Sequence, residues 1–207
     1  NQTGGLGGEM RGSLYRVYVA ADVYGWYKVG GVAGQKDNGA TDITFVGTVV
    51  SEPQSGSEYR AGGIFGDFNG NSGTSSNLVV NATITAIFGP TYNRAGGLIG
   101  SLKDQTIKDS SFTGTVSCAK QCGGIAGVVD SNSNFDNVST SGTVTGLNGT
   151  GGIVGLYNSG TAVAEYLNNV NNQANITGTD SVGGLIGKGT GNSDTLLLTI
   201  KGGSRNS

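Results

Sequence analysis

The feature that most constrains this chain is a short glycine signature, Gly-Gly-x-x-Gly, that recurs along its whole length. It begins at positions 4, 30, 62, 96, 123, 151 and 183, at intervals of 26 to 34 residues. Repeats of this period are typical of solenoids and other arrays, in which each unit packs only against its neighbours. The chain is therefore expected to be a single solenoid over residues 1–207, with seven repeats of which the last is incomplete.

The second half of each unit carries a strand pattern. A small residue, a β-branched residue and another small residue follow one another at a spacing of two positions. Alternation with this period is typical of a strand that turns one face inward. The β-branched residues are expected to stack in one buried column, and they are Val23, Val49, Ile84, Val116, Val144 and Ile176.

A second column, seven positions earlier, consists mostly of Asp and Asn. Its members are Asp42, Asn77, Asp109, Asn137 and Asn169, with Arg16 in the first unit. Such side chains at a turn can hydrogen-bond from one coil to the next. The connection from the β-branched column to the next signature, here called the return, is longer in two units, and these two returns contain Pro53 and Pro90. Solenoids commonly accommodate insertions at one corner in this way. The expected fold class is all-β, a β-solenoid (β-helix) of about seven coils of 26–34 residues.

Composition narrows the function classes. Gly makes up 40 of the 207 residues at fixed motif positions, which indicates tight turns and close backbone packing. Charged residues are 13% of the chain and the net charge is −2, so neither nucleic acid nor an anionic membrane surface is an expected partner. The apolar run Leu196-Leu197-Leu198 is too short to span a bilayer, and no membrane insertion is expected.

These motifs resemble the GLUG repeat family. The resemblance rests on Gly96-Gly97-Leu98-Ile99-Gly100, an Asx- and Ser-rich stretch, and a Gly-x-Val-x segment followed by a short return. It is best from Gly62 to Gly187, while the first unit and the tail from Lys188 depart furthest. The resemblance implies a secreted or cell-surface protein of bacterial type, sometimes an accessory segment beside a peptidase domain. It brings no catalytic residues.

Catalytic and metal-binding constellations are poorly represented. The chain has no His, which removes the commonest general base and most zinc sites. Asp67, Asp104 and Asp130 follow Gly-Gly motifs and are expected to solvate turns. The run Asp67-x-Asn69-x-Asn71 begins like a calcium loop, but Leu78 occupies its twelfth position. We therefore expect no catalytic residue, no cofactor, no metal site and no enzyme activity.

Two kinds of covalent feature are candidates. Cys118 and Cys122 are expected to form a disulfide across a small loop, with two reduced structural thiols as the alternative. Five Asn-x-Ser/Thr sequons are present, about as many as chance provides, and Asn148 lies in an expected return loop. The five candidate glycosylation sites are Asn1, Asn81, Asn137, Asn148 and Asn175.

The residues that flank the buried column are expected to point outward, and many are Thr. The possible binding face consists of Thr83, Thr85, Thr115, Thr143, Thr145 and Thr177. A flat Thr array suits ice, a glycan or lateral packing, although Thr is also an ordinary exposed strand residue. The two functional hypotheses are an extracellular structural or adhesive module and a solenoid that binds glycan or ice through this face.

The ends suggest the partner. Joining the end of one copy to the start of another gives a return from Ile200 to Gly4 of eleven residues, within the range found inside the chain. Unpaired strand edges recruit further strands, and open head-to-tail contacts generate fibres. The expected partner is a second copy or adjoining repeats of a longer chain, with the 4–23 coil against the 194–203 strand.

Overall fold

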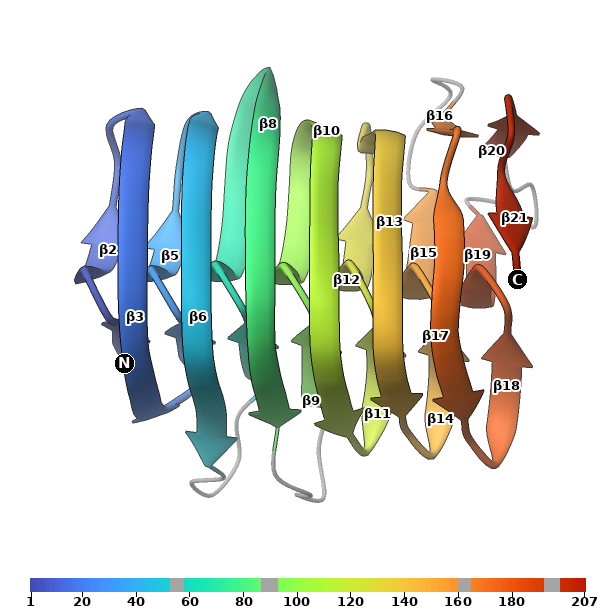
Figure 1. Cartoon of the computed structure of the whole chain (residues 1–207), viewed down its shortest axis with the longest axis horizontal. Helices are drawn as coiled ribbons and strands as arrows, with labels where there is room; N and C mark the ends of the chain where they lie inside the picture. The colour runs from blue at the N-terminus through green and yellow to red at the C-terminus, as the bar shows by residue number, and fades with distance from the viewer. Residues whose placement is uncertain (53–57, 87–92, 160–164, 192–197) are drawn as a thin grey trace.

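The computed structural model describes residues 1–52, 58–86, 93–159, 165–191 and 198–207. These residues form an all-β solenoid of about five turns, without helices (Figure 1). Successive coils lie side by side along the long axis, with the two termini at opposite ends. Pro53, Pro90 and the stretch 192–197, on which some sequence expectations depend, lie outside the described residues.

Each coil begins with a short strand that leads into the Gly-Gly signature. These strands pair in parallel to form a seven-stranded sheet along the solenoid. In spatial order they are β1 (Gln2–Gly4), β4 (Lys28–Gly30), β7 (Tyr59–Gly62), β9 (Asn93–Gly96), β11 (Lys120–Gly123), β14 (Asn148–Gly151) and β18 (Asp180–Gly183).

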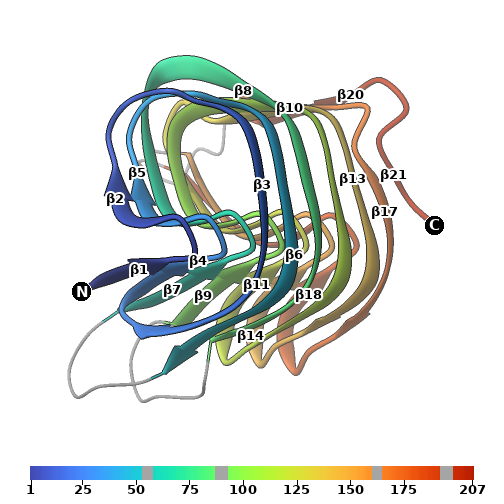
Figure 2. The ribbon, with the colours of Figure 1, turned by 60° about the vertical axis from the view of Figure 1, so that its left-hand side comes forward.

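The chain then turns and forms the second wall and the long outer wall of the coil (Figure 2). All strands of these two walls belong to a 14-stranded parallel sheet. Short strands of the second wall are β2 (Gly7–Met10), β5 (Ala33–Lys36), β12 (Ala126–Asp130), β15 (Val154–Ser159) and β19 (Ile186–Gly191). Strands that form or continue into the outer wall are β3 (Leu14–Trp26), β6 (Ala40–Glu52), β8 (Phe65–Ala86), β10 (Ile99–Cys118), β13 (Asn134–Thr145), β16 (Glu165–Asn168), β17 (Asn171–Thr177), β20 (Leu198–Lys201) and β21 (Arg205–Asn206).

The number of complete turns corrects the sequence expectation. Seven signatures predicted about seven coils, whereas the solenoid has about five turns. All seven signatures do supply a strand to the seven-stranded sheet, but its end strands β1 and β18 have one neighbour each. Counting signatures therefore counts the two end strands together with the five strands that are enclosed on both sides.

The Asx column is a column of sharp bends. Arg16, Asp42, Asn77, Asp109, Asn137 and Asn169 all have φ between 48° and 58°. This left-handed conformation is unfavourable for most side chains, and Asn and Asp tolerate it best. The predicted bonds between coils are confirmed: the amide of Asn137 donates to Asp109 at 2.7 Å, and that of Asn169 donates to Asn137 at 3.0 Å.

The signature glycines allow two backbones to approach each other. A Cβ on Gly97 would lie 2.0 Å from the carbonyl oxygen of Gly124 and 2.3 Å from Cγ of Phe112. One of those atoms belongs to the next coil and the other to the core, so no side chain fits between them. The repeated Gly-Gly thus marks where each coil closes onto its neighbour.

The interior is a stack of side-chain columns. The predicted β-branched column is confirmed, because each member pairs in register with the next from Val23 to Ile176. Val49, Ile84, Val116 and Val144 are fully buried, whereas Ile176 in the last complete coil is half-buried. A neighbouring column changes from Phe112 to Thr140 and Asn172, and the Thr140 hydroxyl donates to the Asn172 amide oxygen at 2.6 Å.

Candidate functional site

The outer wall presents the most regular surface of the molecule. Parallel pairing without a shift between β10 and β13 places each outward residue directly beside its equivalent in the next coil. Thr83, Thr115 and Thr143 consequently form one column. A second column on the same face contains Thr85, Ser117, Thr145 and Thr177.

The exposure of these threonines is uneven. Thr83, Thr115 and Thr177 are exposed, whereas Thr85, Thr143 and Thr145 are half-buried. On the same wall the hydroxyls of Thr113 and Ser141 lie 3.1 Å apart, within hydrogen-bonding distance. The structure therefore brings all six predicted residues onto one wall, next to a contact between two other hydroxyls of that wall.

Cys118 and Cys122 form a disulfide in the structure, with their Cα atoms 5.8 Å apart. The bond joins the end of β10 to β11, at the return into the next coil. Both residues are fully buried, so the disulfide lies inside the wall. Neither thiol is available as a nucleophile or a metal ligand in this form.

The five sequons differ in their surroundings. Asn1, Asn81 and Asn175 are exposed. The amide nitrogens of Asn137 and Asn148 donate to Asp109 and to Asp180, at 2.7 and 2.9 Å. Asn148 was expected in a loop but begins β14 and is half-buried, which corrects that expectation. Glycosylation of either would compete with an existing contact.

The three acids after the signatures do not simply solvate turns, as the sequence had suggested. Asp67 is almost buried and makes ion pairs with Lys28 at 2.6 Å and with Arg60 at 2.7 Å. Asp104 and Asp130 accept hydrogen bonds from Asn132 and Asn158 of adjacent coils, at 2.9 and 3.1 Å. Each carboxylate is thus engaged in a contact between coils.

The calcium-loop pattern is not assembled as a ligand set. Asp67 is engaged with two cations, while the Asn71 amide reaches Asn38 of the preceding coil at 3.0 Å. Within the described ranges no group of three or more His, Cys, Asp or Glu side chains could hold a metal ion. The part of the chain that is described also contains no helix long and apolar enough to cross a membrane.

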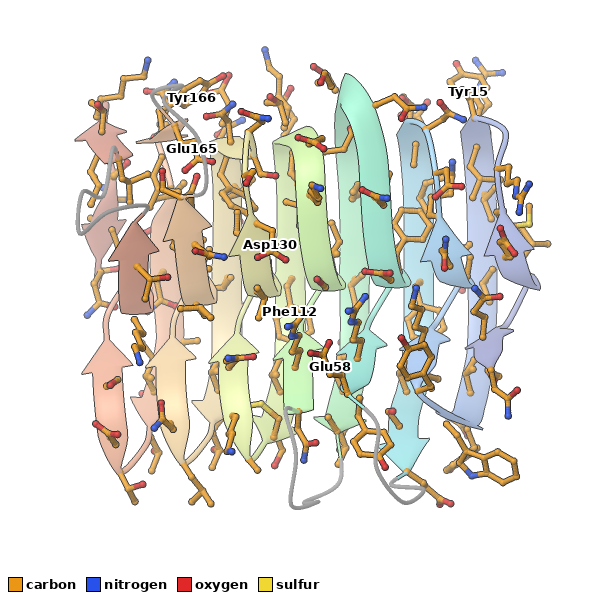
Figure 3. All side chains as sticks on the ribbon, turned by 180° about the vertical axis from the view of Figure 1, so that it is seen from behind. Tyr15, Glu58, Phe112, Asp130, Glu165 and Tyr166 are labelled. Carbon is orange, nitrogen blue, oxygen red and sulfur yellow. A yellow bond between two sulfur atoms is a disulfide. The ribbon has the colours of Figure 1, made fainter. Side chains whose placement is uncertain are left out.

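Buried ionisable side chains lie near both ends of the interior. The Lys36 ammonium is fully buried, and its burial lowers its pKa to about 8. Glu165 is also buried, and burial raises its pKa. Figure 3 shows Glu165 and Tyr166 far along the solenoid from Tyr15. Lys36 and Glu165 lie in different coils, so they do not form an acid–base pair.

Sequence reasoning missed a group of exposed aromatic side chains on the first coil. Tyr18, Tyr24 and Trp26 all occupy outward positions of β3. Tyr24 and Trp26 also line a pocket of about 550 Å³. The alternation rule that located the inward column, applied to the outward positions of the first unit, would have found them.

No protein-family profile matches the chain, and no solved structure matches it significantly. The chain is similar to the immunoglobulin A1 protease of Streptococcus sanguinis, with 27% identity over 117 residues. The aligned region covers 56% of this chain and 6% of that protein, so the chain spans a small fraction of its length.

Proposed function

We propose that this chain is an extracellular structural or adhesive module whose end coils stack on further coils. Those coils come either from a second copy, head to tail in a filament, or from adjoining repeats of a longer surface protein. We also propose that each of the seven signatures marks one repeat of a single GLUG-type domain. The role is not enzymatic.

The observation that carries this proposal is the pairing of the end strands. β1 pairs with β4 on one side and β18 pairs with β14 on one side, within the described part of the chain. On the C-terminal end Ile200 is 54% exposed and Val182 is 47% exposed, whereas equivalent inner positions are covered by a neighbour. A further coil would pair these edges and cover these side chains.

The extracellular placement has two supports. A disulfide persists in oxidising compartments and is rare in the cytosol. The aligned relative carries the name of a protease of immunoglobulin A1, an antibody. Intact mass of protein isolated without reductant tests the first support: a mass two hydrogens below that of the reduced chain is expected. Alkylation of both cysteines without reductant would contradict it.

Light scattering across a concentration series tests the stacking. Head-to-tail association predicts a mean mass that rises continuously with protein concentration, since an open contact does not close. Hydrogen exchange should slow in β1 and β18 as the mass rises. A monomer at every concentration, with both end strands already protected, would refute stacking between copies and between repeats alike.

The second candidate function is recognition of a glycan or of ice by the Thr-bearing outer wall. Its support is the in-register column of Thr83, Thr115 and Thr143. The double variant Thr115→Tyr/Thr143→Tyr tests it, because bulky rings on two adjacent coils would disrupt the lattice while leaving the interior intact. Loss of ligand binding or ice shaping with an unchanged melting temperature would favour this function over the first.

A further inference from the structure

The first coil exposes large aromatic rings, whereas several aromatic rings of the later coils are buried in the part of the chain that is described. Tyr18 is 68% exposed, Tyr24 is 59% exposed and Trp26 is 44% exposed. By contrast, Tyr59 and Tyr157 of later coils are 2% and 0% exposed. Large aromatic groups left in water are unfavourable for folding and are enriched at recognition surfaces.

The orientation of these rings follows from the strand. Val19 and Val23 of β3 point inward, since a Cβ on Gly5 would lie 2.9 and 3.5 Å from their methyl groups. Residues at the intervening positions, among them Tyr24 and Trp26, therefore face outward. Trp26 follows Tyr24 by two residues, so the two side chains leave the same face of the strand. Their Cα atoms are about 7 Å apart.

A pocket adjoins this pair. Its volume is about 550 Å³, which is in the range of small-ligand sites. It is lined by Asn1, Gln2, Thr3, Tyr24, Gly25, Trp26 and Glu52. Gly25 keeps β1 close to the end of β3, because a Cβ there would lie 2.5 Å from the Thr3 hydroxyl. Glu52 comes from the second coil, where it pairs in register with Trp26.

We propose that this pocket is a carbohydrate-binding site that takes a neutral sugar chain whose ring substituents are equatorial. Such a ring has an apolar face of C–H groups, which packs on the electron-rich face of Tyr or Trp. Its edge carries hydroxyls that both donate and accept hydrogen bonds. The Glu52 carboxylate accepts, the Thr3 hydroxyl can do either, and the Asn1 and Gln2 amides provide both functions.

The lining chemistry separates this ligand from other occupants. No Lys or Arg side chain is among the described residues that line the pocket, whereas Glu52 brings a negative charge, which disfavours a phosphorylated or acidic ligand. A purely apolar partner would leave the Glu52 carboxylate without a partner, which is costly. The inference deepens the adhesive role proposed above and rests on it, while naming a ligand class and a site.

The chain itself supplies the probe for a test. Trp26 is its one tryptophan, so tryptophan emission, excited at a wavelength that Tyr does not absorb, reports on this pocket alone in the 207-residue protein. Cellotriose and triacetylchitotriose, both built of all-equatorial β-1,4-linked rings, are titrated at a fixed, dilute protein concentration. A saturable change in Trp26 emission with at least one of them is expected. No change with either, at concentrations up to tens of millimolar, would overturn the proposal.

Variants assign the binding to the two rings. By calorimetry Tyr24→Ala and Trp26→Ala should each weaken binding at least tenfold, and Trp26→Phe should weaken it less because a ring remains. Tyr15→Ala is the matched control, since Tyr15 is 57% exposed at the other end of the same coil and should bind as the unaltered chain does. Equal loss in Tyr15→Ala would contradict the site.

Two further outcomes distinguish this inference from the proposed functions. Loss of sugar binding in Thr115→Tyr/Thr143→Tyr, with Tyr24→Ala unaffected, would move the site to the Thr-bearing wall and reject the pocket. A change of Trp26 emission on raising protein concentration without sugar would make a second copy the occupant, and would also reject it. Sugar binding by a chain that stays monomeric at every concentration would uphold the pocket while refuting stacking between copies.

Discussion

The first and fourth coils follow the same backbone path but differ in what covers them. In the fourth coil Val116 lies between Ile84 and Val144 and is fully buried. In the first coil Val23 lies against Val49 on one side and remains 6% exposed. A single stacking neighbour thus suffices for the backbone geometry, whereas two neighbours are needed for a dry interior.

The outer surfaces of the two coils differ as well. Along the fourth coil the outward positions carry Thr113 and Thr115, and the same wall of the first coil carries Tyr18 and Tyr24. The bend residue is Asp109 in one and Arg16 in the other, although φ is 48° and 52°. The repeat therefore imposes a shape on every coil and leaves the outward chemistry free to vary.

The largest expected effect comes from placing a charge in the inner column. Val116→Asp should destabilise the fold by about 5 kcal/mol, because an unpaired carboxylate would enter a dry stack. Val23→Asp should cost about half as much, since its coil has one neighbour and water lies closer. Urea unfolding of both variants measures the difference. Equal costs would show that the first coil is as enclosed as the fourth, and Thr115→Asp, which faces outward, is the control.

The next effect concerns the close approach of coils at the signature. Gly97→Ala should cost about 3 kcal/mol, because its Cβ would collide with backbone of the fifth coil and with Phe112. Gly12→Ala in the first coil meets nothing within 4 Å and should be nearly neutral. Thermal unfolding compares them. A neutral Gly97→Ala would mean that adjacent coils can separate at this point.

A smaller effect is expected at the Asx column. Asn137→Ala removes a donor to Asp109 and an acceptor for Asn169, and should cost about 2 kcal/mol. Asn137→Gly removes the same hydrogen bonds but keeps the left-handed bend accessible. Comparing the two variants therefore separates the energy of the hydrogen bonds from that of the backbone conformation.

The first coil offers the reverse experiment. Arg16→Asn should stabilise the chain by about 1 kcal/mol, because Asn suits φ of 52° and can reach toward Asp42. Chemical denaturation of Arg16→Asn beside the unaltered chain measures this gain. A loss of stability would indicate that the stacking of Arg16 on the Tyr15 ring, at 4.7 Å, matters more than the bend.

The smallest effect is a pH dependence at the junction of the first two coils. The Lys36 ammonium donates to the carbonyl oxygens of Gly12 and Asn38, at 2.6 and 2.8 Å, and to that of Asp37. Its pKa is lowered to about 8 from 10.5 by burial. Between these values the unfolded chain binds more protons than the folded chain, so stability rises with pH.

Relative to Lys36→Met, the unaltered chain should therefore gain about 1 kcal/mol between about pH 7.5 and pH 8.7. Urea unfolding of both proteins at the two pH values measures this gain. A difference that stays constant, or that falls with pH, would show that the three carbonyl groups hold Lys36 charged and that burial does not control its pKa.

Much of the interior could be predicted from the sequence. The inward column from Val23 to Ile176 and the Asx column follow from spacing, because a strand has a period of two and a repeat has a fixed register. The wall of the Thr residues follows from the same rule. The number of turns was overestimated, since a signature marks the start of a coil without showing that the coil is enclosed.

The remaining features depend on contacts between residues distant in the chain. Asp67 looked like a solvated turn residue until Lys28 and Arg60 were placed beside it from the adjacent seven-stranded sheet. Asn148 looked like a loop residue, but pairing with Lys120 and Asp180 makes it the first residue of β14. Each outcome depends on which coil lies next to the residue, and local spacing carries no information about it.

Coiling, the inward-facing residues and the positions where the backbone must lack a Cβ are readable in the sequence, because they depend on the repeat period and on single-residue sterics. Surfaces composed of residues from different strands and coils depend on the folded arrangement. The pocket between Gln2, Trp26 and Glu52 is of this kind, as its three walls are 24 and 26 residues apart in sequence. Closure of the first coil brings Gln2 near Trp26, and stacking places Glu52 beside Trp26 because the rise from one coil to the next is only about 4.8 Å.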